Sequence, residues 1–226
     1  MPRTEAHPAA PPPFRRPRPA PAGAALSEVF APTGAEAAAA GFVLARLPRG
    51  PAPILWLQDR PAARESGRPY LPGLGPRSLL LMQLPRPADV LAAAEEGLRC
   101  AALAGVVAEL RGNPPAASFT ALKRLALRAE ASGRPCWLIR QAAAEDLSAA
   151  RDRWRIAPLP SAANPDDPRA PGAPRWRVEL FRSRSGRPGE WVASHDRAAD
   201  RLDLVAAVPD GTLDAAVRAA GRGGAG

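Results

Sequence analysis

Short runs of consecutive apolar residues, separated by longer amphipathic stretches, dominate the chain from about residue 24 to residue 140. Such runs are typical of strands that are covered on both faces, as in a parallel sheet flanked by helices. The alternation of strands and helices therefore predicts an α/β fold with a mostly parallel sheet. The predicted strands are Leu26–Phe30, Ile54–Leu57, Leu79–Leu84, Gly105–Leu110 and Cys136–Ile139.

The stretches between these strands carry helix signals. Ala35–Leu47 has an apolar stripe and is followed by Pro48, and a second helix is predicted to begin at Pro87. Ser118 can cap a third helix, which Gly133 would end. Residues 58–76 are predicted to form a loop or a short helix.

The chain changes character after residue 150. Trp176–Leu180 and part of Glu190–Ser194 alternate with period two, and the Ser183–Gly189 stretch between them suits a hairpin turn. A C-terminal β-hairpin is therefore expected. The predicted organisation is a disordered Pro/Arg-rich tail over residues 1–23, one domain over 24–196, and a C-terminal tail over 197–226.

The segment from Leu26 to Ala40 reads as strand, loop and helix, the setting of a phosphate loop. A functional phosphate loop has the form G-x-x-x-x-G-K-[ST], in which backbone amides and a lysine hold phosphates and a hydroxyl holds magnesium. A glycine remains inside the loop, but the positions that matter are replaced, which predicts binding without turnover and no enzymatic activity. The degenerate loop comprises Ala31, Gly34, Glu36, Ala37 and Ala38.

The chain has 31 basic residues and a net charge of +9, and Lys123 is the single lysine. This charge indicates either affinity for a polyanion such as DNA or a compositional bias spread over a solvated surface. Tryptophans flanked by arginines would stack on bases if exposed and would belong to the core if buried. The candidate residues for binding DNA or a partner are Arg151, Arg153, Trp154, Arg155, Trp176, Arg182 and Arg184.

Other chemistry finds little support. His7 and His195 have no ligand-spaced partner and assemble no catalytic triad, so no metal and no cofactor is predicted. Cys100 and Cys136 lie in apolar stretches and are expected to be buried free thiols. No segment has the ~20 apolar residues needed to cross a bilayer, and a cytoplasmic protein is expected.

In the order of these elements the chain resembles the RecA-like core, and in particular the ImuA family of accessory proteins from bacterial damage-induced mutagenesis cassettes. The resemblance runs from about Ala24 to about Asp196. Six blocks in the same order carry it: LSEV from residue 26, ILWLQ from 54, YLPGLG from 70 with LLL from 79, AEEGLRC from 94, AARDRWRI from 149 and ELFRSRSG from 179.

The resemblance implies a non-catalytic scaffold in SOS-induced, error-prone translesion synthesis. Its implied partners are ImuB, an inactive Y-family polymerase relative, and through it an error-prone C-family polymerase. Arg182 and Arg184 resemble the basic pair that reaches a neighbouring subunit's nucleotide in RecA relatives; here they would meet DNA, an acidic partner or only solvent. Glu109 resembles the magnesium-linked acid, or is a strand-end residue facing solvent.

Two alternatives remain open at this point. A cell-division inhibitor of the SulA type shares a RecA-derived fold without a phosphate loop, and its target would be a cytoskeletal GTPase. The second alternative is a divergent recombination NTPase that uses an unconventional loop. The length of the chain and its arginine-rich second half favour the ImuA family.

Overall fold

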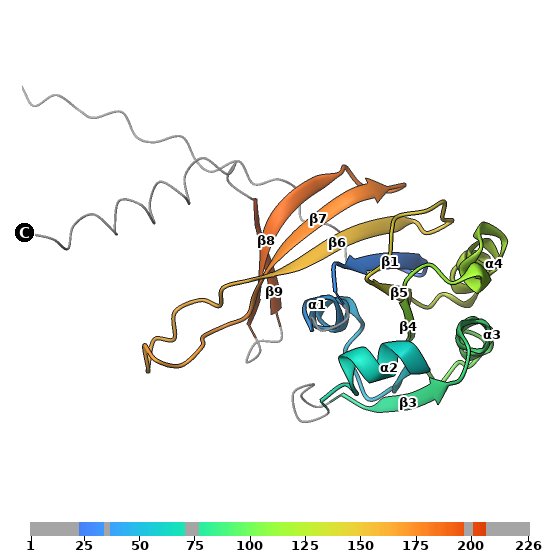
Figure 1. The fold of residues 1–226 in the computed structure, drawn as a ribbon, viewed down its shortest axis with the longest axis horizontal. Helices are drawn as coiled ribbons and strands as arrows, with labels where there is room; N and C mark the ends of the chain where they lie inside the picture. The colour runs from blue at the N-terminus through green and yellow to red at the C-terminus, as the bar shows by residue number, and fades with distance from the viewer. Residues whose placement is uncertain (1–22, 34–36, 71–76, 197–200, 207–226) are drawn as a thin grey trace, which may run out of the picture.

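The computed structural model describes residues 23–33, 37–70, 77–196 and 201–206, whose strands form one sheet in the order β3-β2-β4-β5-β1-β6-β7-β8-β9 (Figure 1). The strands are β1 Leu26–Ala31, β2 Ile54–Asp59, β3 Leu79–Leu84, β4 Gly105–Arg111, β5 Cys136–Gln141, β6 Asp152–Leu159, β7 Arg175–Ser183, β8 Gly189–Asp196 and β9 Arg201–Ala206. The helices are α1 Ala38–Arg46, α2 Arg60–Ser66, α3 Pro87–Gly97 and α4 Phe119–Ser132, with a short 3-10 turn at Pro115–Ala117.

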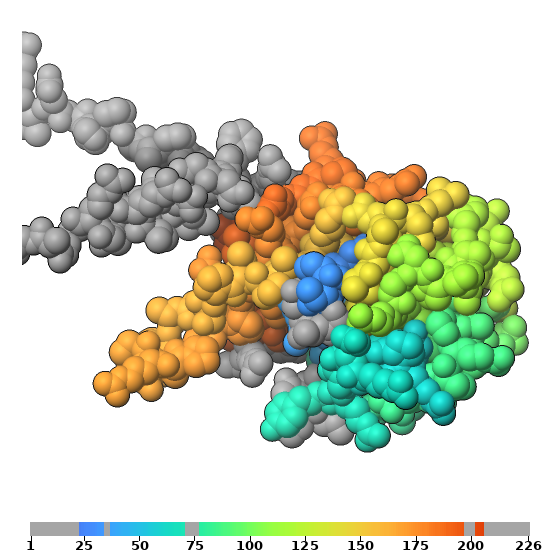
Figure 2. Space-filling view, viewed as in Figure 1, coloured from blue at the N-terminus to red at the C-terminus, as the bar shows by residue number. Residues whose placement is uncertain are grey.

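The sheet has a parallel and an antiparallel part. Strands β1 to β6 run parallel to their neighbours, whereas β7, β8 and β9 are added antiparallel to β6. This arrangement confirms the predicted α/β fold with a mostly parallel sheet, and it is consistent with a RecA-like core followed by a β-hairpin. The predicted hairpin is β7–β8, and the connection between β6 and β7 projects from the body of the domain (Figure 1 and Figure 2).

Helices cover the two faces of the sheet unequally. On one face, the α1 face, Phe42 of α1 packs against the rings of Trp137 and Trp154, and Trp154 packs against Trp191. On the other, the α3/α4 face, Leu122 and similar aliphatic side chains from α3 and α4 meet the leucines and valines of the parallel strands. Because side chains alternate along a strand, each continuous apolar run supplies both cores.

Local signals explain where the helices begin and end. The Ser118 hydroxyl accepts a hydrogen bond from the Ala121 amide at 3.4 Å, and Gly133 ends α4 with a φ of 70°. The Asp59 carboxylate accepts from the Ala62 amide at 2.7 Å and so caps α2, the short helix within residues 58–76. Helix α1 begins after Ala37 without any side-chain cap.

The connection between β5 and β6 is a crossover without a helix. Both strands pair with β1 in parallel, so residues 142–151 must return along β1 from its carboxyl end to its amino end. Ala149 and Ala150 join the core of the α3/α4 face, which places this crossover on that face. This loop therefore covers the α3/α4 face of β1 together with α4, whereas crossovers between parallel strands usually contain a helix of their own.

The structure contains strand β6, which the sequence pattern does not specify, and a strand after residue 197, where the sequence allows one short strand or helix. The segment from Asp152 to Leu159 is strand β6, and β9 lies within the segment expected to be a C-terminal tail, so the sheet extends beyond residue 196. Gly34, Glu36 and most of the N-terminal tail lie outside the described residues. Within the described part, no helix combines the length and the apolarity that a membrane crossing requires.

The aromatic cluster of the α1 face should dominate the stability of the fold. We expect Trp154→Ala to lower the free energy of unfolding by about 3–5 kcal/mol, because it removes a fully buried ring between Phe42 and Trp191. Leu127→Ala, at a side chain that is 57% exposed, should change it by about 0.5 kcal/mol or less. Urea unfolding measures both, and equal effects would contradict this packing.

Candidate functional site

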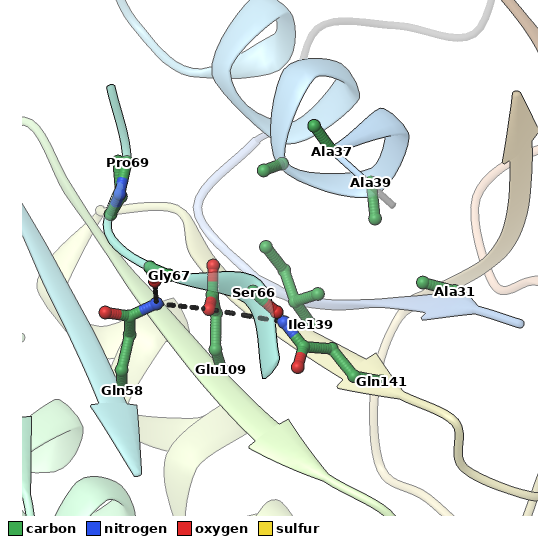
Figure 3. A pocket seen from close by; sticks show the side chains of 11 residues that line it. Ala31, Ala37, Ala39, Gln58, Ser66, Gly67, Pro69, Glu109, Ile139 and Gln141 are labelled. Atoms are coloured by element: carbon green, nitrogen blue, oxygen red, sulfur yellow. Dashed lines mark hydrogen bonds between the residues drawn. The ribbon is translucent and has the colours of Figure 1, made fainter. Parts of the chain in front are cut away.

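A cavity of about 90 Å³ lies where the carboxyl ends of four parallel strands meet the N-terminus of α1 (Figure 3). Open parallel sheets bind ligands at this edge, outside the carboxyl ends of their strands. The cavity wall is mostly apolar, with three polar side chains from the strands. The lining residues are Ala31, Ala37, Ala39, Ala40, Gln58, Ser66, Gly67, Pro69, Glu109, Ile139 and Gln141.

Strand register brings the three polar side chains together. Gln58 of β2 pairs with Glu109 of β4, and Gln141 of β5 pairs with Arg111, two residues after Glu109. Because residues two apart point to the same face, Gln58, Glu109 and Gln141 all project on the α1 face. Each stands at or near the last position of its strand, so the cavity is lined by the sheet's own carboxyl edge.

The Glu109 carboxylate is buried among neutral hydrogen-bond donors. Glu109 is 3% exposed to solvent. The Trp56 indole donates to Oε1 at 2.9 Å, and the Gln58 amide donates to Oε2 at 2.7 Å. The Gln141 amide donates to Oε2 at 3.3 Å, so the two glutamines flank one oxygen (Figure 3). Among the described residues, the hydrogen-bond donors to this carboxylate are all neutral groups.

Burial sets the ionisation of this group. Loss of water around the carboxylate raises the pKa of Glu109 to about 7, and the nearby Asp59 carboxylate also raises it. The hydrogen bonds from Gln58, Trp56 and Gln141 oppose the shift without cancelling it. The cavity therefore contains a carboxyl group that changes charge near neutral pH.

Gln58 connects Glu109 to the surrounding backbone. Its amide nitrogen also donates to the Gly67 carbonyl at 2.9 Å, and its oxygen accepts from the Gln83 amide at 3.4 Å. Gly67, with a φ of 70°, ends α2 and leads to Pro69 in the cavity wall. The carboxylate is thus the centre of a network that joins the strand ends to the end of α2.

This arrangement suits a triphosphate poorly. The cavity is smaller than the ~300–1,000 Å³ typical of small-molecule sites. Of the degenerate loop, Ala31 is buried at the end of β1, Ala37 precedes α1 and Ala38 begins it, so the first turn carries methyl groups. An ionised Glu109 would repel phosphate across the cavity.

The interpretation of Glu109 as a solvent-facing strand end is wrong.

The structure separates the candidate arginines and tryptophans. Trp154 and Trp176 are 0% and 7% exposed and belong to the core, so they cannot stack on bases. Arg153 is buried, and its Nε lies 2.7 Å from Oε2 of the Glu28 carboxylate. The candidates that remain on the surface are Arg151, Arg155, Arg182 and Arg184.

The surface candidates lie far from the cavity along the strands. Asp152, at the amino end of β6, pairs with Ser183, so the β7–β8 turn with Arg182 and Arg184 lies at the end of the sheet opposite the cavity. The Ser183 hydroxyl accepts from the amides of the two residues that follow Arg184. The two candidate regions therefore form separate sites.

The cysteines differ from expectation in one case. Cys136 is fully buried, and burial raises the pKa of its thiol to about 12. Cys100 is exposed, so the expectation of burial is wrong for this residue. It lies in the turn after α3, where Ala101 and Ala102 are exposed as well.

Comparison with known proteins finds two relatives. Two curated proteins, both called Protein ImuA, from the Caulobacter vibrioides strains NA1000/CB15N and ATCC 19089/CB 15, are each 37% identical to the chain over 157 residues. These matches support an ImuA family assignment. The matched region covers 64% of the chain and 61% of each relative, so the chain spans about three fifths of the length of these ImuA proteins. No protein-family model matches the chain.

The ionisation of Glu109 should appear in the pH dependence of stability. A raised pKa means that the folded protein holds this proton more tightly than the unfolded chain, so stability falls as pH rises from about 4.5 to about 7. As pH rises over this range, the free energy of unfolding of Glu109→Gln should increase by up to about 3 kcal/mol relative to that of the wild type. Urea unfolding at several pH values measures the difference.

A matched control isolates the buried site. Glu96 has a side chain that is 67% exposed, and Glu96→Gln should show a nearly constant difference from wild type over the same pH range. If the Glu109 and Glu96 variants change with pH in parallel, the burial argument fails.

Proposed function

We propose that the chain is a non-catalytic RecA-like accessory protein of SOS-induced, error-prone translesion DNA synthesis. It would act as a scaffold on an inherited nucleotide-binding fold and would need no cofactor. Its proposed partners are an ImuB-type inactive Y-family polymerase and, through it, an error-prone C-family polymerase, in the cytoplasm. The similarity to two ImuA proteins supports this assignment of pathway.

The observation that carries the non-catalytic part is the composition of the cavity. Its α1 wall consists of alanine side chains, and its sheet wall presents Glu109 among the neutral amides of Gln58 and Gln141. Phosphate transfer needs cationic groups or bound metal to stabilise charge on the phosphoryl oxygens. The residues that line this cavity supply a carboxylate instead.

A genetic test separates this function from cell-division inhibition. Deletion of the gene should abolish damage-induced mutagenesis, and re-expression of the chain should restore it. Overexpression should leave cell length unchanged. Filamentation on overexpression, with mutagenesis unaffected by the deletion, would favour a SulA-type inhibitor and contradict the proposal.

The proposed DNA contact at the β7–β8 turn has its own test. Arg182→Ala with Arg184→Ala should weaken binding to single-stranded DNA and reduce the slope of log K against log salt by about 1.4, or roughly 0.7 per lost phosphate contact. Arg99→Ala with Arg124→Ala removes the same charge from exposed positions near α3 and α4 and should change binding little. Fluorescence anisotropy at several salt concentrations measures both. An unchanged slope in the first variant would exclude the turn.

A further inference from the structure

A cluster of charged side chains lies on the α3/α4 face of β1, beneath the helix-free crossover. Glu28 of β1 is fully buried, and so is Arg140 of β5. Arg153 of β6 is nearly so, with a side chain that is 5% exposed. Its Nε donates to Glu28 at 2.7 Å, whereas Nη1 of Arg140 lies 3.4 Å from the same carboxylate. One buried carboxylate thus faces two buried guanidinium groups.

The second negative charge comes from the crossover itself. Asp146 has a side chain that is 39% exposed, and it lies 3.4 Å from Nη2 of Arg140 and 4.0 Å from Nη2 of Arg153. Nε of Arg140 and Nη2 of Arg153 are buried and make no hydrogen bond within the described part of the chain. Buried charged donors without partners are costly, so this cluster retains unused capacity for an anion.

Arg155 extends the cluster along β6. Its Nε and Nη2 face the two carboxylate oxygens of Glu145, with Nη2 at 2.8 Å, and its Nη1 donates to Glu179 at 2.7 Å. This fork matches the geometry of a carboxylate or a phosphate. The guanidinium also lies 4.2 Å from the centre of the Phe181 ring.

Neighbouring residues of the crossover, Glu145 and Asp146, therefore neutralise Arg140, Arg153 and Arg155. If the crossover moved away, three guanidinium groups would face only Glu28 and Glu179. Arg153 and Arg155 are two residues apart on β6, so they would follow one another on one face of the strand at a spacing of about 6.7 Å. The result would be a cationic row beside an aromatic ring, which is the combination that single-strand binders use.

The middle of the crossover, residues 143–147, is held by contacts with side chains, whereas residues 148–150 near its far end are buried. The Asn113 side chain bonds the Ala144 amide and carbonyl, both at 2.8 Å, and the Asp146 carboxylate at 2.9 Å. Ala142, where the crossover begins, has a φ of 49°, a left-handed conformation that alanine adopts only when its surroundings impose it. Ten residues can reach about 34 Å, whereas a six-residue strand is about 20 Å long, so residues 143–147 have slack to move while residues 148–150 stay in the core.

We propose that Arg140, Arg153 and Arg155 form a binding row for the phosphodiester backbone of single-stranded nucleic acid, and that Glu145 and Asp146 occupy this row in the unbound protein. The choice of nucleic acid rests on the proposed function and on the net charge of +9. Nucleic acid binds by displacing the two carboxylates, which compete with it from within the chain.

The test removes the competing charges without changing their shape. Glu145→Gln with Asp146→Asn should raise the affinity for fluorescein-labelled oligothymidylate about tenfold and should steepen the salt dependence by up to about 2, or roughly 0.7 for each arginine released. Asp166→Asn with Asp167→Asn makes the same charge change in the exposed β6–β7 connection and should give a much smaller gain. Anisotropy titrations compare the variants, and thermal melts confirm that each is folded.

Several outcomes would overturn the inference. Equal gains in the two double variants would reduce the effect to net charge, and no gain in a folded variant would leave the cluster purely structural. If the double variant unfolds, Glu145→Gln alone, at an exposed residue, should still show part of the gain. A gain for polyglutamate without one for oligothymidylate would point to an acidic protein and would contradict nucleic-acid binding.

The inference and the proposed function fail in different ways. Adding Arg155→Gln to the double variant should abolish the gain in affinity, because it removes the most exposed fork of the row. If mutagenesis requires the chain but the double variant gains nothing, the binding row is wrong and the proposed function stands. If the double variant gains affinity but deletion leaves mutagenesis intact, the binding row stands and the proposed function is wrong.

Discussion

The burial of the Glu109 carboxylate among neutral donors is the interaction on which the chemistry of the carboxyl edge depends. Trp56, Gln58 and Gln141 hold it in place, and in the part of the chain that the structure describes its hydrogen-bond donors are all neutral. A buried carboxylate without a counter-ion has a raised pKa and disfavours any anion nearby. The fold thus retains the place where parallel sheets bind phosphate groups, while the residues at that place oppose such a ligand.

Buried charge is stabilised differently on the two faces of the sheet. On the α1 face, the buried Glu109 carboxylate accepts hydrogen bonds from amides and an indole, so its charge depends on pH. On the α3/α4 face, Glu28 is paired with Arg140 and Arg153, and a loop takes the place of a covering helix. Burial of an ion pair contributes little net stability but is costly to leave incomplete, which makes the second cluster responsive to added anions.

Much of the fold follows from the sequence, because short apolar runs and caps such as Ser118 and Gly133 act locally. The sequence pattern does not specify strand β6, because its inward residues alternate with arginines, two of which bind the carboxylates of Glu28 and Glu145. The burial of Trp154 and Trp176 depends on tertiary packing against α1, which no local pattern specifies. The candidate site did leave a signal in the sequence, since Gln58, Glu109 and Gln141 all stand near the ends of apolar strands.

Isothermal titration calorimetry with ATP and magnesium measures most directly whether the carboxyl edge has lost its ancestral ligand. Titrations at pH 6 and pH 8 bracket the ionisation of Glu109 and so cover both charge states of the cavity. No binding heat at either pH, with protein at concentrations that would detect a dissociation constant of about 1 mM, is the expected result. Saturable binding at micromolar concentrations would contradict the account.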